Sequence, residues 1–275
     1  MSPIDAVVLG VVQGLTEFLP VSSSGHLVVF EALLGAQQSG VAFEVVVHGG
    51  TLLAVLLVYG RDIGRILRDT ARALPMLLRG DGRGAYALED FRLGLLLLVG
   101  TVPTAAIGLL LEDTFKALFS SLSAVGVAFL VTGALLHLAD RVTRRAEARI
   151  RPLSPGRALA IGVAQGAAIT PGISRSGSTI ATALLLGIDR VRAAQYSFLL
   201  SVPAILGAMI LELRHGLPPV AGGLLPYALG FVAAALSGFG ALRVLLRLVR
   251  LGRLGVFAWY LWPLGLGVLA WAQLH

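Results

Sequence analysis

Apolar residues in this chain form long, continuous runs that charged residues rarely interrupt. A membrane span needs about 20 mostly apolar residues, and six runs approach or reach that length: 41–59, 93–111, 122–139, 193–211, 224–242 and 255–274. The strands of an outer-membrane barrel would instead show short segments in which apolar and polar residues alternate. The pattern therefore predicts an all-α, polytopic integral membrane protein with six transmembrane helices.

Two further apolar stretches, 4–34 and 158–187, are too short for a pair of spans because they hold only 31 and 30 residues. Each is also interrupted near its middle, the first by Pro20 and the second by Pro171 and Gly172. Proline lacks the backbone N–H that a helix needs and breaks or kinks it there. We therefore interpret both stretches as re-entrant helical hairpins, which enter and leave the membrane on the same side.

The positions of the basic residues indicate how these segments are oriented. Nineteen of the 22 lysines and arginines fall in four short segments, 61–92, 141–157, 190–192 and 243–253. Cytoplasmic loops carry an excess of such residues, so we expect all four segments to be cytoplasmic. This orientation places both termini outside, with the first hairpin inserted from the outer face and the second from the cytoplasmic face.

The overall composition agrees with a membrane protein. Of 275 residues, 56% are hydrophobic and 13% are charged, a balance that would leave a soluble domain with too little polar surface. The net charge of +7 is explained by membrane orientation, so nucleic acid is not an expected partner. The chain has no cysteine, which excludes disulfides, thiol nucleophiles and thiolate metal sites.

The two hairpins resemble each other at a fixed offset. Gln13 lies 152 positions before Gln165, and the same offset relates two serines and a glycine of each hairpin. The chain therefore divides into a first repeat (1–140), a cytoplasmic Arg-rich linker (141–157) and a second repeat (158–275), and each repeat is a hairpin followed by three spans. Three spans invert the second repeat relative to the first within one membrane domain, so we expect the hairpin tips to meet.

The first hairpin carries polar residues around its tip. Gln13 and Glu17 are four residues apart, so a helix presents both on one face. Residues 22–24 are serines at the start of the returning half-helix, where hydroxyls can cap the helix and free N–H groups attract an anion. His26 lies one turn after Ser23 and could face the same cavity.

The second hairpin offers a cation in the corresponding place. Arg175 stands among residues that open another half-helix, namely Ser174, Ser176, Gly177, Ser178 and Thr179. An arginine at membrane depth is costly unless it is paired or hydrated, and its planar fork fits a phosphate. Two anion-binding helix starts with an arginine between them suit a diphosphate, and a carboxylate, an imidazole and a guanidinium together suit phosphoryl transfer.

Structural roles compete with each of these assignments. Serine and glycine commonly pack membrane helices together, so any one serine here is more often structural than catalytic. Glu17 and Arg175 could form a buried ion pair that holds the tips together, although ionisable groups inside a membrane usually mark a site. His48, one turn from Glu44, is a lesser candidate that could simply bridge helices.

The residues of the two tips resemble the signatures of a known family. Residues 13–26 read QGLTEFLPVSSSGH, which is similar to the first signature of the undecaprenyl-pyrophosphate phosphatase (bacitracin-resistance) family. Residues 171–179 read PGISRSGST and are similar to its second signature, P-G-x-S-R-S-x-x-T. Gln13 stands where many members have glutamate, and Ser24 replaces a frequent threonine.

The resemblance implies a phosphatase that removes the terminal phosphate of undecaprenyl pyrophosphate and regenerates the monophosphate carrier lipid for cell-wall synthesis. It implies catalytic roles for Glu17, Ser23, His26 and Arg175. The other polar residues and the glycine of the two tips are the candidate substrate contacts, namely Gln13, Ser22, Ser24, Ser174, Ser176, Gly177 and Thr179. The resemblance also implies a divalent cation, Mg²⁺ or Ca²⁺, held by Glu17 and Gln13.

The resemblance further implies a setting for the enzyme. The protein would lie in the bacterial inner (plasma) membrane, among membrane lipids, with its active site open to the periplasm or the outside. It would confer resistance to bacitracin, which competes with the enzyme by binding the substrate.

The sequence leaves two questions open: which group attacks the terminal phosphorus, and whether the protein is an enzyme or a transporter. Ser23 or a water could attack the terminal phosphorus, with His26 as base and then acid. A lipid-phosphate transporter or flippase is the alternative function, because inverted repeats with paired broken helices are also the architecture of secondary carriers. The two tips carry different groups, a carboxylate and an imidazole on the first and a guanidinium on the second, and this difference favours an enzyme. No pattern in the sequence indicates an oligomeric state.

Overall fold

The computed structural model describes residues 1–34, 41–145, 150–214 and 223–274. Every regular element within these ranges is a helix, and none of them contains a strand. The order along the chain is α1 (Pro3–Phe18), α2 (Ser23–Leu34), α3 (Val41–Leu78), α4 (Gly82–Ala87), α5 (Glu89–Leu110), α6 (Glu112–Phe119), α7 (Leu122–Arg145), α8 (Pro155–Ala167), α9 (Arg175–Leu185), α10 (Arg190–Arg214), α11 (Leu224–Arg250), η1 (Leu254–Phe257) and α12 (Ala258–Leu274). The prediction of an all-α protein is confirmed.

Six helical segments of the described chain are long and apolar enough to cross a membrane, which confirms the six predicted spans. They are α3, α5, α7, α10, α11 and the joined η1 and α12. Several continue past the apolar runs because charged residues at their ends prolong the helix. For example, α11 ends at Arg250, eight residues beyond the predicted end of its apolar run.

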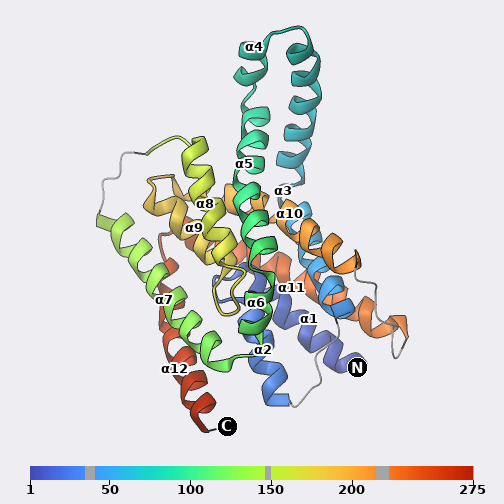
Figure 1. Cartoon of the computed structure of the whole chain (residues 1–275), viewed down its shortest axis with the longest axis vertical. Helices are drawn as coiled ribbons and strands as arrows, with labels where there is room; N and C mark the ends of the chain where they lie inside the picture. The colour runs from blue at the N-terminus through green and yellow to red at the C-terminus, as the bar shows by residue number, and fades with distance from the viewer. Residues whose placement is uncertain (35–40, 146–149, 215–222, 275) are drawn as a thin grey trace.

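Helix α3 departs most from its predicted length. It holds 38 residues and runs through Pro75 to Leu78, whereas its apolar run is half as long. At 1.5 Å per residue the helix is about 57 Å long, against roughly 30 Å for the hydrocarbon core of a bilayer. Its second half projects from the molecule together with α4 and the start of α5 (Figure 1). Along this projection Arg65 pairs with Asp62 at 2.6 Å and with Asp90 of α5 at 3.3 Å.

Two pairs of shorter helices precede the long helices in the two halves of the chain. Helices α1 and α2 hold 16 and 12 residues, and α8 and α9 hold 13 and 11. All four are shorter than the roughly 20 residues that a span requires. The breaks at residues 19–22 and 168–174 contain the prolines that mark them in the sequence. Each pair is therefore a helix, a turn and a returning helix.

The short pairs are held inside the bundle by close helix packing. Helix α1 lies against α11, and a methyl group added to Gly14 would overlap Ser237 and the backbone of Gly238. Helix α8 lies against α5 in the same way, with Gly162 against the backbone of Gly100. Small residues at such contacts let membrane helices approach closely. The packing is reciprocal. Helix α1 of the first half rests on α11, the second long helix of the second half, and α8 of the second half rests on α5, the second long helix of the first half.

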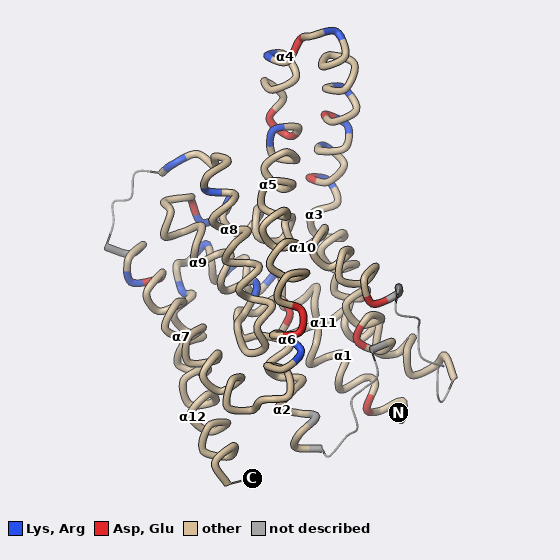
Figure 2. The backbone as a smooth tube through the Cα atoms, viewed as in Figure 1, with Lys and Arg blue, Asp and Glu red and all other residues tan. Residues whose placement is uncertain are grey.

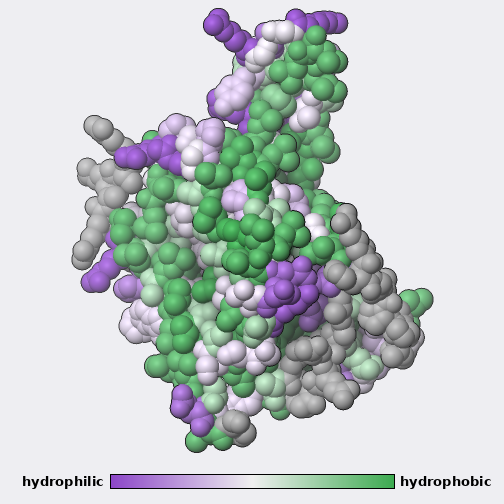
Figure 3. All heavy atoms as spheres, in the orientation of Figure 1, coloured by the Kyte–Doolittle hydropathy of each residue, from purple (hydrophilic) through white to green (hydrophobic). Residues whose placement is uncertain are grey.

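The outer surface of the molecule is largely apolar. Hydrophobic residues cover most of the face shown in Figure 3, and hydrophilic residues gather around α4 and α6. Large apolar side chains point outwards along the long helices, including Leu57 at 64% and Leu110 at 82% exposure. Apolar surface on this scale indicates contact with lipid. Figure 2 shows most lysines and arginines toward the end that carries α4, and both termini lie at the opposite end.

Candidate active site

The first tip is formed where α1 ends and α2 begins. Glu17 lies in the last turn of α1, one turn after Gln13, whose Nε2 donates to Glu17 Oε2 at 3.1 Å. Both side chains are buried, Gln13 completely and Glu17 to 8% exposure. The two side chains thus share one helix face, as their spacing in the sequence indicates.

Ser22 forms the turn between these helices in a left-handed backbone conformation. Its φ of 70° is the one positive φ at a non-glycine residue in the described part of the chain. Such a conformation costs about 1–3 kcal/mol and persists only where surrounding contacts hold it. The Ser22 hydroxyl accepts the backbone N–H of Gly25 at 3.3 Å and lies 3.3 Å from Ser24 Oγ. The Ser22 side chain therefore caps the start of α2, and its substrate contact stays a prediction.

The Glu17 carboxylate joins the two halves of the chain. Ser23 Oγ donates to Glu17 Oε2 at 2.7 Å, and Arg175 Nη2 donates to Glu17 Oε1 at 2.7 Å. Arg175 lies 158 positions further along the chain, at the start of α9, and its side chain is 16% exposed. The structure therefore brings a hydroxyl, a carboxylate and a guanidinium into one hydrogen-bonded cluster.

His48 is a further member of this cluster. It comes from α3, and its Nε2 lies 3.9 Å from Glu17 Oε2. Its Nδ1 lies 2.8 Å from the carbonyl oxygen of Glu44, one turn earlier. The sequence marks His48 only as a lesser candidate, because its sole signal is its spacing from Glu44. Nothing in the sequence links it to the hairpin tips.

Two buried polar atoms of the cluster have no hydrogen-bond partner among the residues that the structure describes, Gln13 Oε1 and Arg175 Nη1. Buried polar atoms are normally paired, so each indicates a group that this chain does not itself supply. A guanidinium nitrogen suits a phosphate oxygen, and an amide oxygen suits a hard cation. Arg175 Nη1 is therefore suited to an anion and Gln13 Oε1 to a cation.

The second tip opens α9 with Ser174 as its cap. Ser174 Oγ accepts the backbone N–H of Gly177 at 3.1 Å, and its own N–H donates to Thr132 Oγ1 of α7 at 3.2 Å. The carbonyl of Gly172 accepts from the same Thr132 hydroxyl at 3.1 Å. These bonds fix the backbone that places Arg175 beside Glu17.

The hydroxyl residues of α9 are engaged within the protein. Thr179 Oγ1 donates to the carbonyl of Arg175 at 2.8 Å and lies 2.5 Å from Ser197 Oγ of α10. Ser174, Ser176 and Thr179 are each 1% exposed or less. Hydrogen bonds within the protein give Ser174 and Thr179 a structural role. The contacts of all three residues with substrate stay predictions.

The two tips touch through glycine residues. A Cβ added to Gly25 of α2 would stand 2.8 Å from the Cα of Gly172 and 2.7 Å from the ring of Phe129. A Cβ added to Gly177 of α9 would stand 3.2 Å from Pro20 in the first tip. A side chain at Gly25 would overlap its neighbours and one at Gly177 would crowd Pro20, so these glycines allow the close approach of the tips.

His26 contacts a different set of groups from those around Glu17. Its Nδ1 lies 2.7 Å from the Ser22 carbonyl oxygen, and its Nε2 lies 2.7 Å from the hydroxyl of Tyr260 in α12. Its ring packs edge-on against Phe129 of α7, with 5.3 Å between centroids. In the described chain no hydrogen bond joins His26 to Ser23. Sequence reasoning missed Tyr260, because it lies inside an apolar run at no informative spacing.

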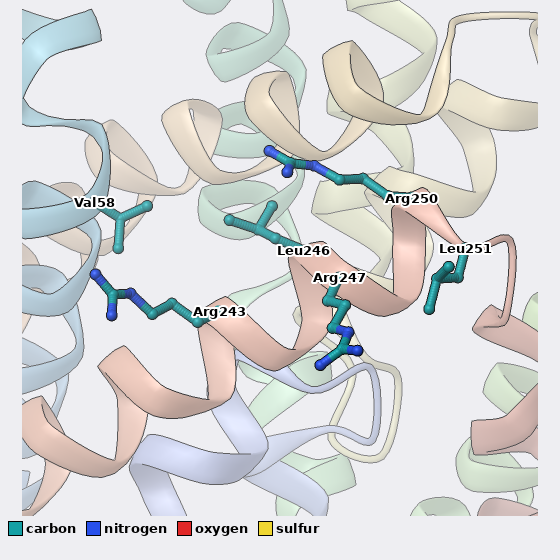
Figure 4. A pocket seen from close by; sticks show the side chains of 6 residues that line it. All are labelled: Val58, Arg243, Leu246, Arg247, Arg250 and Leu251. Atoms are coloured by element: carbon teal, nitrogen blue, oxygen red, sulfur yellow. The ribbon is translucent and has the colours of Figure 1, made fainter.

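A cavity of about 520 Å³ lies between α11 and α3. Its lining shares no residue with the cluster and consists of Val58, Arg243, Leu246, Arg247, Arg250 and Leu251 (Figure 4). Two of its arginines lie in the last turn of α11, where positive charge stabilises the negative end of the helix dipole. This position gives the two arginines a structural role in α11.

Known proteins resemble this chain along its whole length. A family model described as "Bacitracin resistance protein BacA" matches residues 6–267. An undecaprenyl-diphosphatase from Desulfosudis oleivorans is 47% identical over 277 residues, which cover 100% of both chains. Proteins of the same name from Halothermothrix orenii and Carboxydothermus hydrogenoformans are 43% and 41% identical, over 98% of this chain and 97% of each relative. The chain therefore belongs to the bacitracin resistance protein BacA family.

Proposed function

We propose that this protein is an undecaprenyl-diphosphatase, which hydrolyses the anhydride bond of undecaprenyl diphosphate and releases the terminal phosphate. The family and its full-length relatives of that name support the activity. The observation that carries it is the contact of Ser23 and Arg175 with the same Glu17 carboxylate. Glu17 thus contacts both a candidate nucleophile, Ser23, whose proton it can accept, and a cation, Arg175, that is suited to bind phosphate.

Arg175 and the two helix starts are suited to hold the diphosphate. Arg175 uses Nη2 for Glu17 and keeps Nη1 buried and without a partner in the described chain, so one nitrogen is left for a phosphate oxygen. The N-termini of α2 and α9 add free N–H groups and the positive ends of two helix dipoles. The polyprenyl tail stays among the apolar helices in the membrane.

The hydrogen bond of Ser23 indicates how attack begins. In a covalent route Ser23 Oγ bonds to the terminal phosphorus, the anhydride bond to undecaprenyl phosphate breaks, and Glu17 takes the hydroxyl proton. Water then attacks the phosphoserine, His26 takes a proton from that water, and Glu17 returns its proton to Ser23 Oγ as phosphate leaves. In a direct route water attacks the substrate with His26 as base, and Ser23 binds a phosphate oxygen.

A divalent cation fits the donors at the first tip. No group of three or more His, Asp or Glu side chains able to hold a metal occurs within the described residues. Mg²⁺, however, is commonly bound by one or two carboxylates together with substrate phosphates and water. Glu17 and the unpartnered Gln13 Oε1 would hold such an ion jointly with the diphosphate. The bound ion would neutralise charge on the phosphate oxygens.

Phosphate release by the purified protein tests the proposal. In detergent with Mg²⁺, the wild type should release phosphate from a polyprenyl diphosphate, and Glu17→Gln or Arg175→Ala should abolish release. Lys116→Gln is the matched control, because it breaks an exposed ion pair with Glu112 on α6 and should leave the rate unchanged. A wild type that releases no phosphate, yet moves polyprenyl phosphate across vesicles, would establish the transporter alternative.

The fate of Ser23 separates the two routes. Acid quenching during turnover of a substrate labelled in its terminal phosphate should trap label on Ser23 if the covalent route operates. Full single-turnover activity in Ser23→Ala would instead establish direct attack by water.

The membrane arrangement that we propose has α1–α2 and α8–α9 as re-entrant hairpins of two inverted repeats. The shortness of these helices, their reciprocal packing on α11 and α5 and the concentration of basic residues at one end (Figure 2) support it. The protein then lies among the lipids of a bacterial plasma membrane, with the site open to the outside. Bacitracin, by binding the same lipid diphosphate, would compete with the enzyme for substrate.

A further inference from the structure

We propose that Tyr260 is a positioning residue of the active site, because its hydroxyl holds His26 as a neutral imidazole with its lone pair on Nε2. The inference rests on the proposed function and concerns a residue outside both hairpins. Tyr260 lies 234 positions from His26, yet its hydroxyl is 2.7 Å from Nε2. The two rings are nearly parallel, with an interplanar angle of 8° and 5.8 Å between centroids.

The other ring nitrogen determines which atom donates. His26 Nδ1 lies 2.7 Å from the carbonyl oxygen of Ser22. A carbonyl oxygen can only accept, so Nδ1 carries a hydrogen. In the neutral ring Nε2 is then the acceptor, and the Tyr260 hydroxyl donates to it.

The Ser22 carbonyl is itself fixed by the turn between α1 and α2. It also accepts the backbone N–H of His26 at 3.2 Å, and it belongs to the residue with a φ of 70°. The turn therefore fixes the tautomer of His26 from one side, and Tyr260 orients the ring from the other.

Tyr260 is the titratable side chain that faces His26 in the described structure. Helix α7 contributes the Phe129 ring, α12 contributes Tyr260, and His26 as a residue is 5% exposed. Glu17 of α1 and Arg175 of α9 pair with each other, and neither makes a hydrogen bond or ion pair with His26 among the described residues.

This contact favours the form of His26 that can act as a base. Donation from Tyr260 to Nε2 requires the unprotonated ring, and a phenol is a better donor than acceptor, so the bond favours the neutral imidazole. Tyr260 is 48% exposed, and its hydroxyl must leave Nε2 before His26 can act on a water. When a water takes its place, Nε2 can accept the proton of that water.

Tyr260→Phe removes the hydroxyl and keeps the ring. We would measure kcat and KM for phosphate release across pH, with Tyr86→Phe as the matched control, because Tyr86 on α4 is also 48% exposed. The acidic limb of the kcat/KM profile of Tyr260→Phe should move up by about half a unit to one unit, the shift that one ordinary hydrogen bond produces. KM at high pH should stay unchanged, and the Tyr86→Phe profile should match the wild type.

Two outcomes would overturn the inference. One is a Tyr260→Phe profile that coincides with the wild type, and the other is a rate that falls equally at every pH, as a structural role predicts. If the wild type releases no phosphate, the proposed function fails and the contact remains testable. The ¹⁵N resonance of His26 Nε2 in detergent micelles should then still shift in Tyr260→Phe and not in Tyr86→Phe, and an unmoved resonance would refute the contact.

Discussion

At the residue scale, the candidate site converges on one carboxylate. Glu17 accepts hydrogen bonds from Gln13, Ser23 and Arg175, and His48 lies 3.9 Å away. Removing one partner of a buried ion pair typically costs 3–5 kcal/mol, because the other charge is left uncompensated. Substitutions of Glu17 therefore disturb stability as well as chemistry, and a substitution that keeps the charge of Arg175 is more informative.

Arg175→Lys tests the double role of the guanidinium. Arg175 bonds Glu17 through Nη2 and leaves Nη1 for substrate, whereas lysine has a single nitrogen and no planar fork. Losing one charge-assisted hydrogen bond of about 2 kcal/mol should lower kcat/KM roughly thirtyfold.

Thermal unfolding in detergent should show that Arg175→Lys remains folded. A variant with wild-type kcat/KM would show that Arg175 only pairs with Glu17 and does not bind phosphate.

The sequence singled out most residues of this cluster, but it gave no signal for Tyr260, which contacts His26 outside the cluster. Glu17, Ser23 and Arg175 stand out because ionisable groups and serine clusters are rare in apolar hairpins. Tyr260 does not stand out, since a tyrosine in an apolar run is equally suited to packing or to the membrane interface. Its role depends on which side chain of another helix it meets.

At the scale of elements, glycine residues decide how closely the two tips approach. Gly25 lies against the Cα of Gly172 and the ring of Phe129. A backbone atom cannot move aside as the end of a flexible side chain can. The start of α2, which carries Ser23 and His26, is therefore held directly against the second tip.

Gly25→Ala should force the tips apart. Overpacking of this kind typically costs 1–3 kcal/mol, so we expect a lower unfolding temperature in detergent together with reduced phosphate release. Gly240→Ala in α11 is the control, because an added methyl group there meets no atom within 4 Å. The control should be neutral or up to about 1 kcal/mol more stable, since alanine favours helix over glycine. Equal behaviour of the two variants would contradict the tight contact.

Helix type and helix length differ in how well the sequence predicts them. The six spans are continuous apolar runs and are confirmed. The apolar run predicts only the first half of α3, because the second half is rich in charged residues, among them Arg65, which pairs with Asp90 of α5.

At the scale of the whole molecule, the two halves pack on each other reciprocally. Helix α1 rests on α11, α8 rests on α5, and the last long helices of the two halves, α7 and α12, lie together. Both termini lie at the end of the molecule opposite α4 (Figure 1). This arrangement is what two inverted repeats would produce, and it predicts opposite faces for α4 and α6.

The absence of cysteine makes this orientation directly measurable. Single variants Arg83→Cys in α4 and Ser120→Cys after α6 place one thiol at each end, and both positions are exposed. In spheroplasts, a membrane-impermeant maleimide should label Ser120→Cys at once and Arg83→Cys only after permeabilisation. Labelling of Arg83→Cys in intact spheroplasts would reverse the proposed orientation and the side on which the site opens.

The sequence by itself determined the membrane class, the six spans and the polar residues of the two tips, because hydropathy, prolines and charge placement are properties of neighbouring residues. Only the tertiary structure decided which of those residues meet. Glu17 pairs with Arg175 across 158 positions, and His26 turns from that pair to Tyr260 across 234. Contacts at such separations depend on how closely helices pack, and that packing is set by many glycine and side-chain contacts acting together.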